Sequence, residues 1–181
     1  MKKSIAVLFL CLASTCLLSS CAYFALTPIG LLINHIKKND GGENEKMKIA
    51  IMDFRDGVGV NRSEVDGLSD MLINTMFKTG KFEIIERTQL NQVLKEQKLQ
   101  GELTTQQLAK VGRILGVESI LVGTVNYVRG EYNIDVRAVD VETAMIVTTA
   151  GASKKSMSSY RKMMEKIGKQ LAKNLLSNKN H

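Results

Sequence analysis

Tryptophan is absent from the sequence, and only five phenylalanines and four tyrosines are present. Aromatic residues interleaved with basic ones form the stacking surfaces of many nucleic-acid-binding proteins, and this sequence has no such run. We therefore interpret the net charge of +7 as solvated surface and expect no nucleic-acid partner. A hydrophobic content of 44% suffices for the core of one domain, whereas a mean hydropathy of -0.04 argues against many membrane spans.

Cysteine is also scarce, and its three positions, 11, 16 and 21, all lie near the N-terminus. Residues 1–20 have the layout of a signal peptide, in which Lys2 and Lys3 precede an apolar stretch from Ile5 to Leu18. About fourteen apolar positions are fewer than the roughly 20 that a helix needs to span a bilayer. The first twenty residues are therefore expected to be a signal peptide.

Cys21 follows the run Leu18-Ser19-Ser20, which resembles the lipobox of bacterial lipoproteins. In that family, signal peptidase II cuts before the cysteine, whose sulfur carries a diacylglycerol and whose new amino group is acylated. We expect lipidation at Cys21. Two alternatives remain: cleavage after Ala22 in ordinary secretion, and an uncleaved anchor that continues to Leu32.

Acylation of Cys21 would leave the mature chain without a free thiol, so no disulfide, cysteine metal site or thiol redox site is expected. Several acyl chains anchor a protein firmly, since each buried methylene contributes roughly 0.8 kcal/mol. Ala22, and not Asp, follows the cysteine. By resemblance to enterobacterial sorting, this residue favours the outer membrane, with the chain facing the periplasm.

Residues 21–46 are expected to form the lipidated anchor, an apolar segment and a linker. The segment from Ala22 to Ile36 is apolar, so it could lie in the membrane interface, pack on a partner, or dock on the domain as a strand or short helix. Lys37–Lys46 is charged and contains two glycines, which is typical of a linker. The folded domain is expected over residues 47–178.

The hydrophobic pattern of this domain predicts an α/β (α+β) fold with a mixed sheet of about five strands. A βαβ unit should come first, followed by an antiparallel meander, with helices packed on the sheet. The expected strands are Met47–Phe54, Lys81–Arg87, Val117–Val128, Glu131–Val141 and Ala144–Ala152. The expected helices run from Ser63 to Gly80, over Thr88–Leu99 and Thr104–Gly116, and from Ser156 to Leu176.

Several details of the helices can also be predicted. Ser63 to Asp66 is similar to a capping box, with Asp in place of the usual Glu. The third helix should direct Leu108, Val111, Ile114 and Leu115 inward. The last helix has a buried apolar stripe and an opposite stripe of lysines at 162, 166, 169 and 173. These lysines either form a solvated face or meet anionic lipid headgroups.

Three stretches together resemble the curli assembly/transport component (CsgG) family over roughly residues 47–155. They are KIAIMDF, FEIIERTQLNQVLKEQKL, and LAKVGRILGVESILVGTV leading into VDVETAMIV. The resemblance implies an α/β domain shared with periplasmic lipoprotein activators of penicillin-binding proteins and with the amino-terminal domain of the Tol-associated β-propeller protein. We interpret the motif as structural, with Arg87 a candidate partner for Glu96.

One departure from the family bears on function. Secretion channels of the curli type insert two long hairpins per subunit into the membrane, and each membrane strand needs about 9–11 residues. Only Arg129-Gly130 separates the third and fourth strands, and Ala152 runs almost directly into the last helix. We therefore expect that this chain does not form the pore.

Catalytic chemistry has little support in the sequence. His35 and His181 lie near the two ends, with no second ligand nearby. The run DGVGV lacks the spacing and the lysine of nucleotide-binding loops, so its glycines are interpreted as turn residues. Asp53 and Asp56 could form a carboxylate pair, but no neighbouring residue completes a catalytic set. No catalytic residue, cofactor or metal site is predicted, and the chain is not expected to be an enzyme.

Two functions remain. The first is an outer-membrane lipoprotein that assists secretion or cell-envelope biogenesis through protein partners, as a monomer or as a homo-oligomer, without being a pore. The second is a regulatory lipoprotein that activates a peptidoglycan synthase (a penicillin-binding protein). In both cases the membrane is contacted through the N-terminal lipid. The partner and the cargo are not identified by the sequence.

Overall fold

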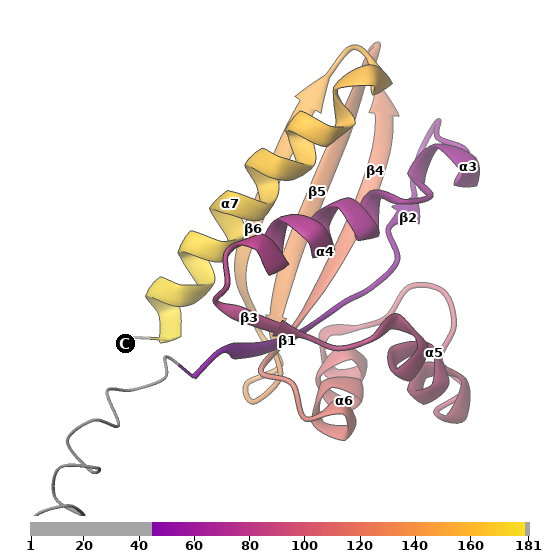
Figure 1. The fold of residues 1–181 in the computed structure, drawn as a ribbon. Helices are drawn as coiled ribbons and strands as arrows, with labels where there is room; N and C mark the ends of the chain where they lie inside the picture. The colour runs from indigo at the N-terminus through magenta and orange to yellow at the C-terminus, as the bar shows by residue number, and fades with distance from the viewer. Residues whose placement is uncertain (1–44, 180–181) are drawn as a thin grey trace, which may run out of the picture. The chain divides into compact units, whose positions relative to one another are not determined.

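The computed structural model describes residues 45–179 (Figure 1). The expectations for the signal peptide, Cys21, the segment from Ala22 to Ile36, and both histidines lie outside the described residues. No helix within 45–179 is long and apolar enough to cross a membrane.

A single mixed sheet forms the centre of the domain, which confirms the predicted α/β fold (Figure 1). Its strands are β1 (Met47–Ile51), β2 (Arg55–Asp56), β3 (Phe82–Ile84), β4 (Ser119–Val128), β5 (Glu131–Asp140) and β6 (Ile146–Lys154). Their order is β3-β1-β4-β5-β6, with β2 also paired to β4. β1 is parallel to β3 and β4, while β4, β5 and β6 are antiparallel. The parallel βαβ unit and the antiparallel meander that follows it both agree with the prediction.

The sheet has six strands, and the additional one is β2, in a segment that was expected to be a loop. The chain leaves β1 and then pairs again with β4, where Arg55 lies opposite Thr124. The backbone N–H of Gly57 continues this contact by donating to the carbonyl of Val125 at 2.8 Å. Pairing with a distant strand produces β2, so local sequence could not reveal it.

The helices are α3 (Arg62–Val65), α4 (Leu68–Lys78), α5 (Arg87–Glu96), α6 (Thr105–Leu115) and α7 (Tyr160–Lys179), with a short 3₁₀ helix, η2 (Met157–Ser159), before α7. The prediction of a single helix between Ser63 and Gly80 is wrong, because two helices form and the helical conformation is interrupted at Gly67. Gly67 has a φ of 83°, in the left-handed region that glycine tolerates. The capping interaction lies two residues earlier than predicted, since the backbone N–H of Asn61 donates to the Glu64 carboxylate at 2.7 Å.

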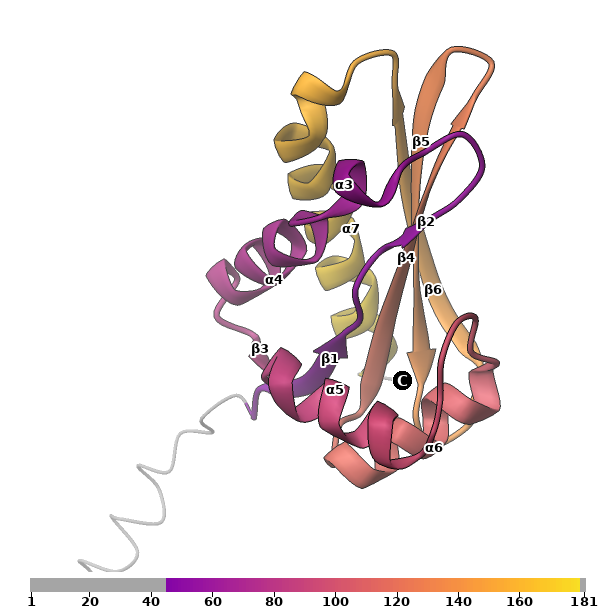
Figure 2. The same ribbon diagram turned by 90° about the vertical axis from the view of Figure 1, so that its right-hand side faces the viewer.

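Helices cover both faces of the sheet (Figures 1 and 2). On one face, α4 and α7 bury Leu72, Met76, Met164 and Leu171 against β1, β4 and β5. On the other face, α5 and α6 pack a smaller cluster against the lower part of the sheet in Figure 2. The apolar stripe predicted for the last helix is buried, as expected.

One residue of α6 does not face the core as expected. Leu108 and Val111 are fully buried, but Ile114 is 49% exposed. Six residues rotate an α-helix by about 240° from Leu108, so Ile114 lies at the margin of the apolar face. Its exposure corrects the prediction that four residues of this helix point inward.

The turn between β4 and β5 contains only Arg129 and Gly130, as the sequence predicted. Val128 pairs directly with Glu131 across the hairpin. Arg129 and Gly130 have φ values of 55° and 80°, the left-handed conformations that suit a two-residue turn between twisted strands. This hairpin places the tip of β4 beside the loop that follows β2 (Figure 2).

Candidate functional site at the ends of the parallel strands

The candidate site lies where the parallel strands β1 and β3 end. The connection from β1 to β3 runs through α4 on one face, and the connection from β3 to β4 runs through α5 and α6 on the other (Figure 2). In open α/β sheets, such a reversal at the carboxyl ends of the strands is where ligands bind. Asp53 follows β1 and Arg87 follows β3, so these two charged residues meet at this point.

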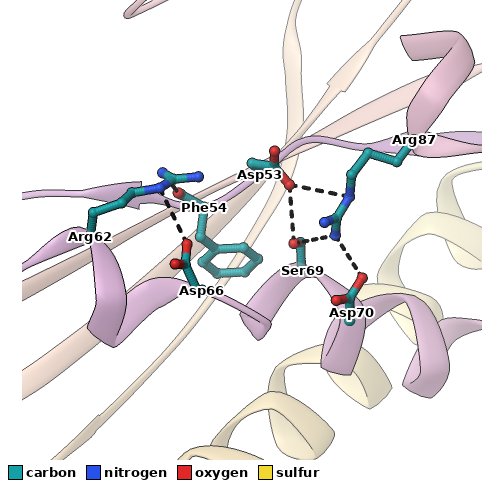
Figure 3. Close-up of polar contacts among 7 residues, drawn as sticks. All are labelled: Asp53, Phe54, Arg62, Asp66, Ser69, Asp70 and Arg87. Carbon is teal, nitrogen blue, oxygen red and sulfur yellow. Dashed lines mark hydrogen bonds and ion pairs between the residues drawn. The ribbon is translucent and has the colours of Figure 1, made fainter. Parts of the chain in front are cut away.

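Arg87 is the centre of a polar network (Figure 3). Its Nε lies 3.2 Å from Asp53 Oδ1, and its Nη2 donates to Asp70 Oδ1 at 2.7 Å. The same Nη2 donates to Ser69 Oγ at 2.6 Å, and Ser69 Oγ donates to Asp53 Oδ1 at 3.3 Å. Ser69 lies in the first turn of α4 and is only 3% exposed, and the network gives its buried hydroxyl both a hydrogen-bond donor and an acceptor.

The expected pairing of Arg87 with Glu96 is wrong. Glu96 accepts a hydrogen bond from Gln92 at 2.9 Å on the exposed side of α5. Arg87 and Glu96 are nine positions apart, which places them about 180° apart around the helix. Arg87 is the first residue of α5, and its side chain extends instead to the first turn of α4 (Figure 3).

A second arginine holds the loop after β1 (Figure 3). Arg62 Nη1 donates to the carbonyl oxygen of Phe54 at 2.7 Å, and its Nε lies 3.3 Å from Asp66 Oδ1. Asp56 also lies 3.7 Å from the Arg62 guanidinium. Asp53 and Asp56 are thus held by two different arginines, and each carboxylate acts as an ion-pair partner.

Beside these arginines is a cavity of about 460 Å³ with an apolar floor and a charged mouth. Leucines from α5, α6 and the loop between them line the floor, namely Leu90, Leu94, Leu103 and Leu108. At the mouth, Arg55 Nη2 donates to Glu102 Oε1 at 3.0 Å. This hydrogen bond, the charge of Arg55 and the charge of Arg137 lower the pKa of Glu102 below its usual value. The Nε atoms of Arg55 and Arg137 are buried and have no hydrogen-bond partner within residues 45–179.

Comparison with known proteins identifies the family. The family described as "Curli production assembly/transport component CsgG" matches residues 35–128. The chain belongs to the CsgG family. This match includes β1 to β4, the Arg87 network and the Arg62 contacts, whereas Arg137 of the cavity lies beyond it.

Solved structures agree with the fold of this CsgG-family chain. The LpoB C-terminal domain from Escherichia coli has a TM-score of 0.52 at 14% identity, and that from Salmonella enterica has 0.50 at 17%; each match covers 70% of this chain and 94% of the other. Lipoprotein GNA1162 from Neisseria meningitidis has a TM-score of 0.50 at 13% identity, covering 60% of this chain and 80% of the other. At these identities the likeness shows the fold alone. No curated protein matches the sequence.

The candidate site of this CsgG-family domain consists mainly of arginine and aspartate side chains that form ion pairs with one another. Ser69 is in contact with a carboxylate and a guanidinium, and no histidine lies within residues 45–179 to act as its base. In the same range, no group of three His, Cys, Asp or Glu residues is placed to hold a metal ion. The chemistry that these groups can perform is polar recognition, through guanidinium and carboxylate groups at the mouth of an apolar cavity.

Sequence reasoning missed a surface at the hairpin tip, which we call the tip cluster: Val58, Tyr127 and Val128. Their exposed fractions are 72%, 39% and 46%. The Tyr127 N–H donates to the Val58 carbonyl at 2.8 Å, so the backbones of these two residues are adjacent at the tip, while the side chains of Tyr127 and Val128 alternate between the two faces of β4. The Tyr127 ring packs on Tyr132 with centroids 4.6 Å apart. The sequence could have indicated this surface, because two apolar residues directly precede the polar turn Arg129-Gly130.

Proposed function

We propose that this CsgG-family protein is a non-enzymatic lipoprotein that is anchored through Cys21 in the outer membrane and faces the periplasm. Its role is to assist secretion or cell-envelope assembly through protein contacts, without itself forming a pore. In this proposal, residues 1–20 are removed, residues 21–46 are the anchor and linker, and residues 47–178 are the working domain. The tip cluster is the observation that carries it, because several exposed apolar side chains at one end of a sheet are typical of protein-binding surfaces.

The polar site supports a role without catalysis. Arg87 and Arg62 are occupied by Asp53, Asp70, Asp56 and Asp66, which hold the loop after β1 against α3 and α4. That loop leads directly to Val58. The ion pairs therefore fix the backbone of the loop that leads to Val58. In this proposal, their role is to position the tip cluster.

Two short connections support the proposal that the chain does not form the pore. β4 and β5 are joined through Arg129 and Gly130, and β6 is joined to α7 by a bend and the 3₁₀ helix η2. The measurement is ion conductance across liposomes that contain the purified lipoprotein. Discrete channel currents would refute this part of the proposal.

Lipidation is tested by metabolic labelling with an alkyne fatty acid. Cys21→Ser should abolish the label, whereas the matched control Cys16→Ser should retain it, since residue 16 lies in the segment that is removed. Equal labelling of the wild type and Cys21→Ser would refute the anchor.

The partner is tested with a photo-crosslinking residue at Val128 in living cells, with the same residue at Ile114 as an exposed control on α6. Crosslinks from Val128 to a secretion or fibre component, or to a second copy, would support the assembly role. A crosslink to a peptidoglycan synthase would instead support the second candidate, a regulatory lipoprotein. Identical crosslinks from both positions would refute a specific role for the tip cluster.

A further inference from the structure

The charge of the protein is concentrated on one helix. α7 contains six basic residues and one acidic residue, so it supplies +5 of the net charge of +7. α3, α4 and α5 each mix the two signs, and α6 carries only two basic residues, Lys110 and Arg113. A charge excess that is largest on one surface helix indicates a partner with the opposite charge.

Four lysines of α7 form a narrow stripe, here called the basic face: Lys162, Lys166, Lys169 and Lys173. All four are exposed, while Met163, Met164, Ile167 and Leu171 from the same turns are buried. Spacings of four, three and four residues keep the four lysines within about 60° around the helix axis. Glu165 pairs with Lys169 at 2.8 Å, and the other three lysines have no ion pair within residues 45–179.

The end of α7, six residues beyond Lys173 of the basic face, lies where the chain enters the domain. Lys179, at the end of α7, lies 3.0 Å from Glu118, and the other carboxylate oxygen of Glu118 accepts a hydrogen bond from the backbone N–H of Lys48 in β1. Glu118 therefore connects the last turn of α7 with the first strand. In Figure 1, the end of α7 and the start of β1 are correspondingly side by side.

We propose that the basic face of α7 docks on anionic phospholipid headgroups of the membrane that holds the lipid anchor. This inference rests on the proposed lipidation of Cys21, because the anchor keeps the domain beside a membrane surface. The chain joins the domain next to the end of α7, so this face is close to the tether. A lysine near an anionic surface contributes about 1 kcal/mol, which is roughly a fivefold gain in the docking equilibrium.

Docking would give the anchored domain a defined orientation. An acyl anchor combined with a basic patch is the usual pair of signals for stable membrane association. With the basic face on the headgroups, the tip cluster lies near the start of α7, away from the end where the chain enters (Figure 1). Partners would then meet the domain at a fixed distance from the membrane.

The test uses the mature lipoprotein with Ser177→Cys, which is exposed on α7 and supplies the free thiol when Cys21 is acylated. A fluorophore at this position is measured in phosphatidylcholine vesicles with and without phosphatidylglycerol, using lipids that carry a quencher near the headgroup. Quenching at Ser177→Cys should rise with phosphatidylglycerol and fall in about 1 M salt, where the Debye length is about 3 Å. A label at Gln106→Cys on α6 should not respond.

Two matched triple variants test which lysines are responsible. K162Q/K166Q/K173Q should weaken docking roughly 100-fold, because three lysines are lost. K95Q/K98Q/K110Q removes the same charge from exposed positions on the α5 and α6 side and should leave docking unchanged. Equal quenching with and without phosphatidylglycerol, or equal loss in both triple variants, would overturn the proposal. Unchanged thermal unfolding confirms that the variants fold.

The failure of the anchor can be distinguished from the failure of the docking face. Intact mass spectrometry shows whether Cys21 carries acyl chains. If it does not, the proposed anchor is wrong, and co-sedimentation of the same chain with phosphatidylglycerol vesicles still tests the basic face. Acylated protein that shows no response to phosphatidylglycerol would leave the anchor intact and refute the docking.

Discussion

The ring of Phe54 lies directly over the backbone of Gly123 in the middle of β4. A Cβ atom placed on Gly123 would be 2.3 Å from Phe54 Cε1. Phe54 is 1% exposed, and it follows β1 in the loop that Arg62 and Arg87 hold in place. The glycine therefore allows the loop before the tip cluster to pack tightly on the central strand.

Gly123→Ala should destabilise the domain because the ring of Phe54 has to move. Overpacking of this kind costs about 1–3 kcal/mol, measurable as a lower midpoint in urea unfolding. Phe54→Leu in the same chain should relieve the clash, so the double variant should lose less stability than the sum of the two single variants. Strict additivity would show that the two residues do not compete for this space.

Removal of the Arg87 guanidinium should also destabilise the domain. Arg87→Ala would leave Asp53, Asp70 and the buried Ser69 hydroxyl without their shared donor. Because Arg87 is one-third exposed, water can replace part of the interaction, and we expect a loss of about 1–2 kcal/mol. Arg113→Ala is the control, since Arg113 is exposed and makes one hydrogen bond of 3.3 Å. A similar loss in both variants would contradict a special role for the network.

The partners of Arg87 show why the site was harder to predict than the fold. Ser69 and Asp70 lie 18 and 17 residues before Arg87, and they meet it only because α4 returns the chain to the sheet. Sequence spacing tests neighbours on one helix, so it could not reveal either of these partners. The stripe of α7 was predicted correctly because periodic burial is a local property of one long helix.

The break at Gly67 illustrates a different limit. Apolar residues on either side of Gly67 keep helical spacing, and a glycine inside such a pattern costs only about 1 kcal/mol, so one helix was the simpler prediction. In the structure, Arg62 holds α3 to the loop after β1, which forces the chain to turn before α4. A tertiary contact therefore overrides the local pattern.

Neutralising Arg55 should remove the main cause of the lowered Glu102 pKa. The Arg55 hydrogen bond is the main cause of the lowered Glu102 pKa, with smaller effects from the charges of Arg55 and Arg137. In Arg55→Gln, the pKa of Glu102 should rise, as measured by NMR titration of its side-chain carboxyl. Arg113→Gln should leave it unchanged. No change in Arg55→Gln would show that the two side chains do not pair in solution.

Tyr160 should make stability depend on pH in the alkaline range. Its hydroxyl is buried without a hydrogen-bond partner among residues 45–179, and burial raises its pKa from 10 to about 12. Above pH 10 the unfolded chain loses this proton first, so the free energy of unfolding falls as pH rises from 10 to about 12. The loss is at most about 2–3 kcal/mol for a shift of this size.

Tyr160→Phe isolates this contribution, because the variant has no proton to lose at this position and the other titrating groups are unchanged. Below pH 10, the variant should be as stable as the wild type or more stable by about 1 kcal/mol, since a buried hydroxyl without a partner is removed. Between pH 10 and 12 the difference in free energy of unfolding should move further in favour of the variant. Urea unfolding at several pH values measures this difference. A difference that stays constant across this range would mean that Tyr160 ionises equally easily in the folded and unfolded chains, and that it is not buried at the start of α7 beside Tyr132 of β5.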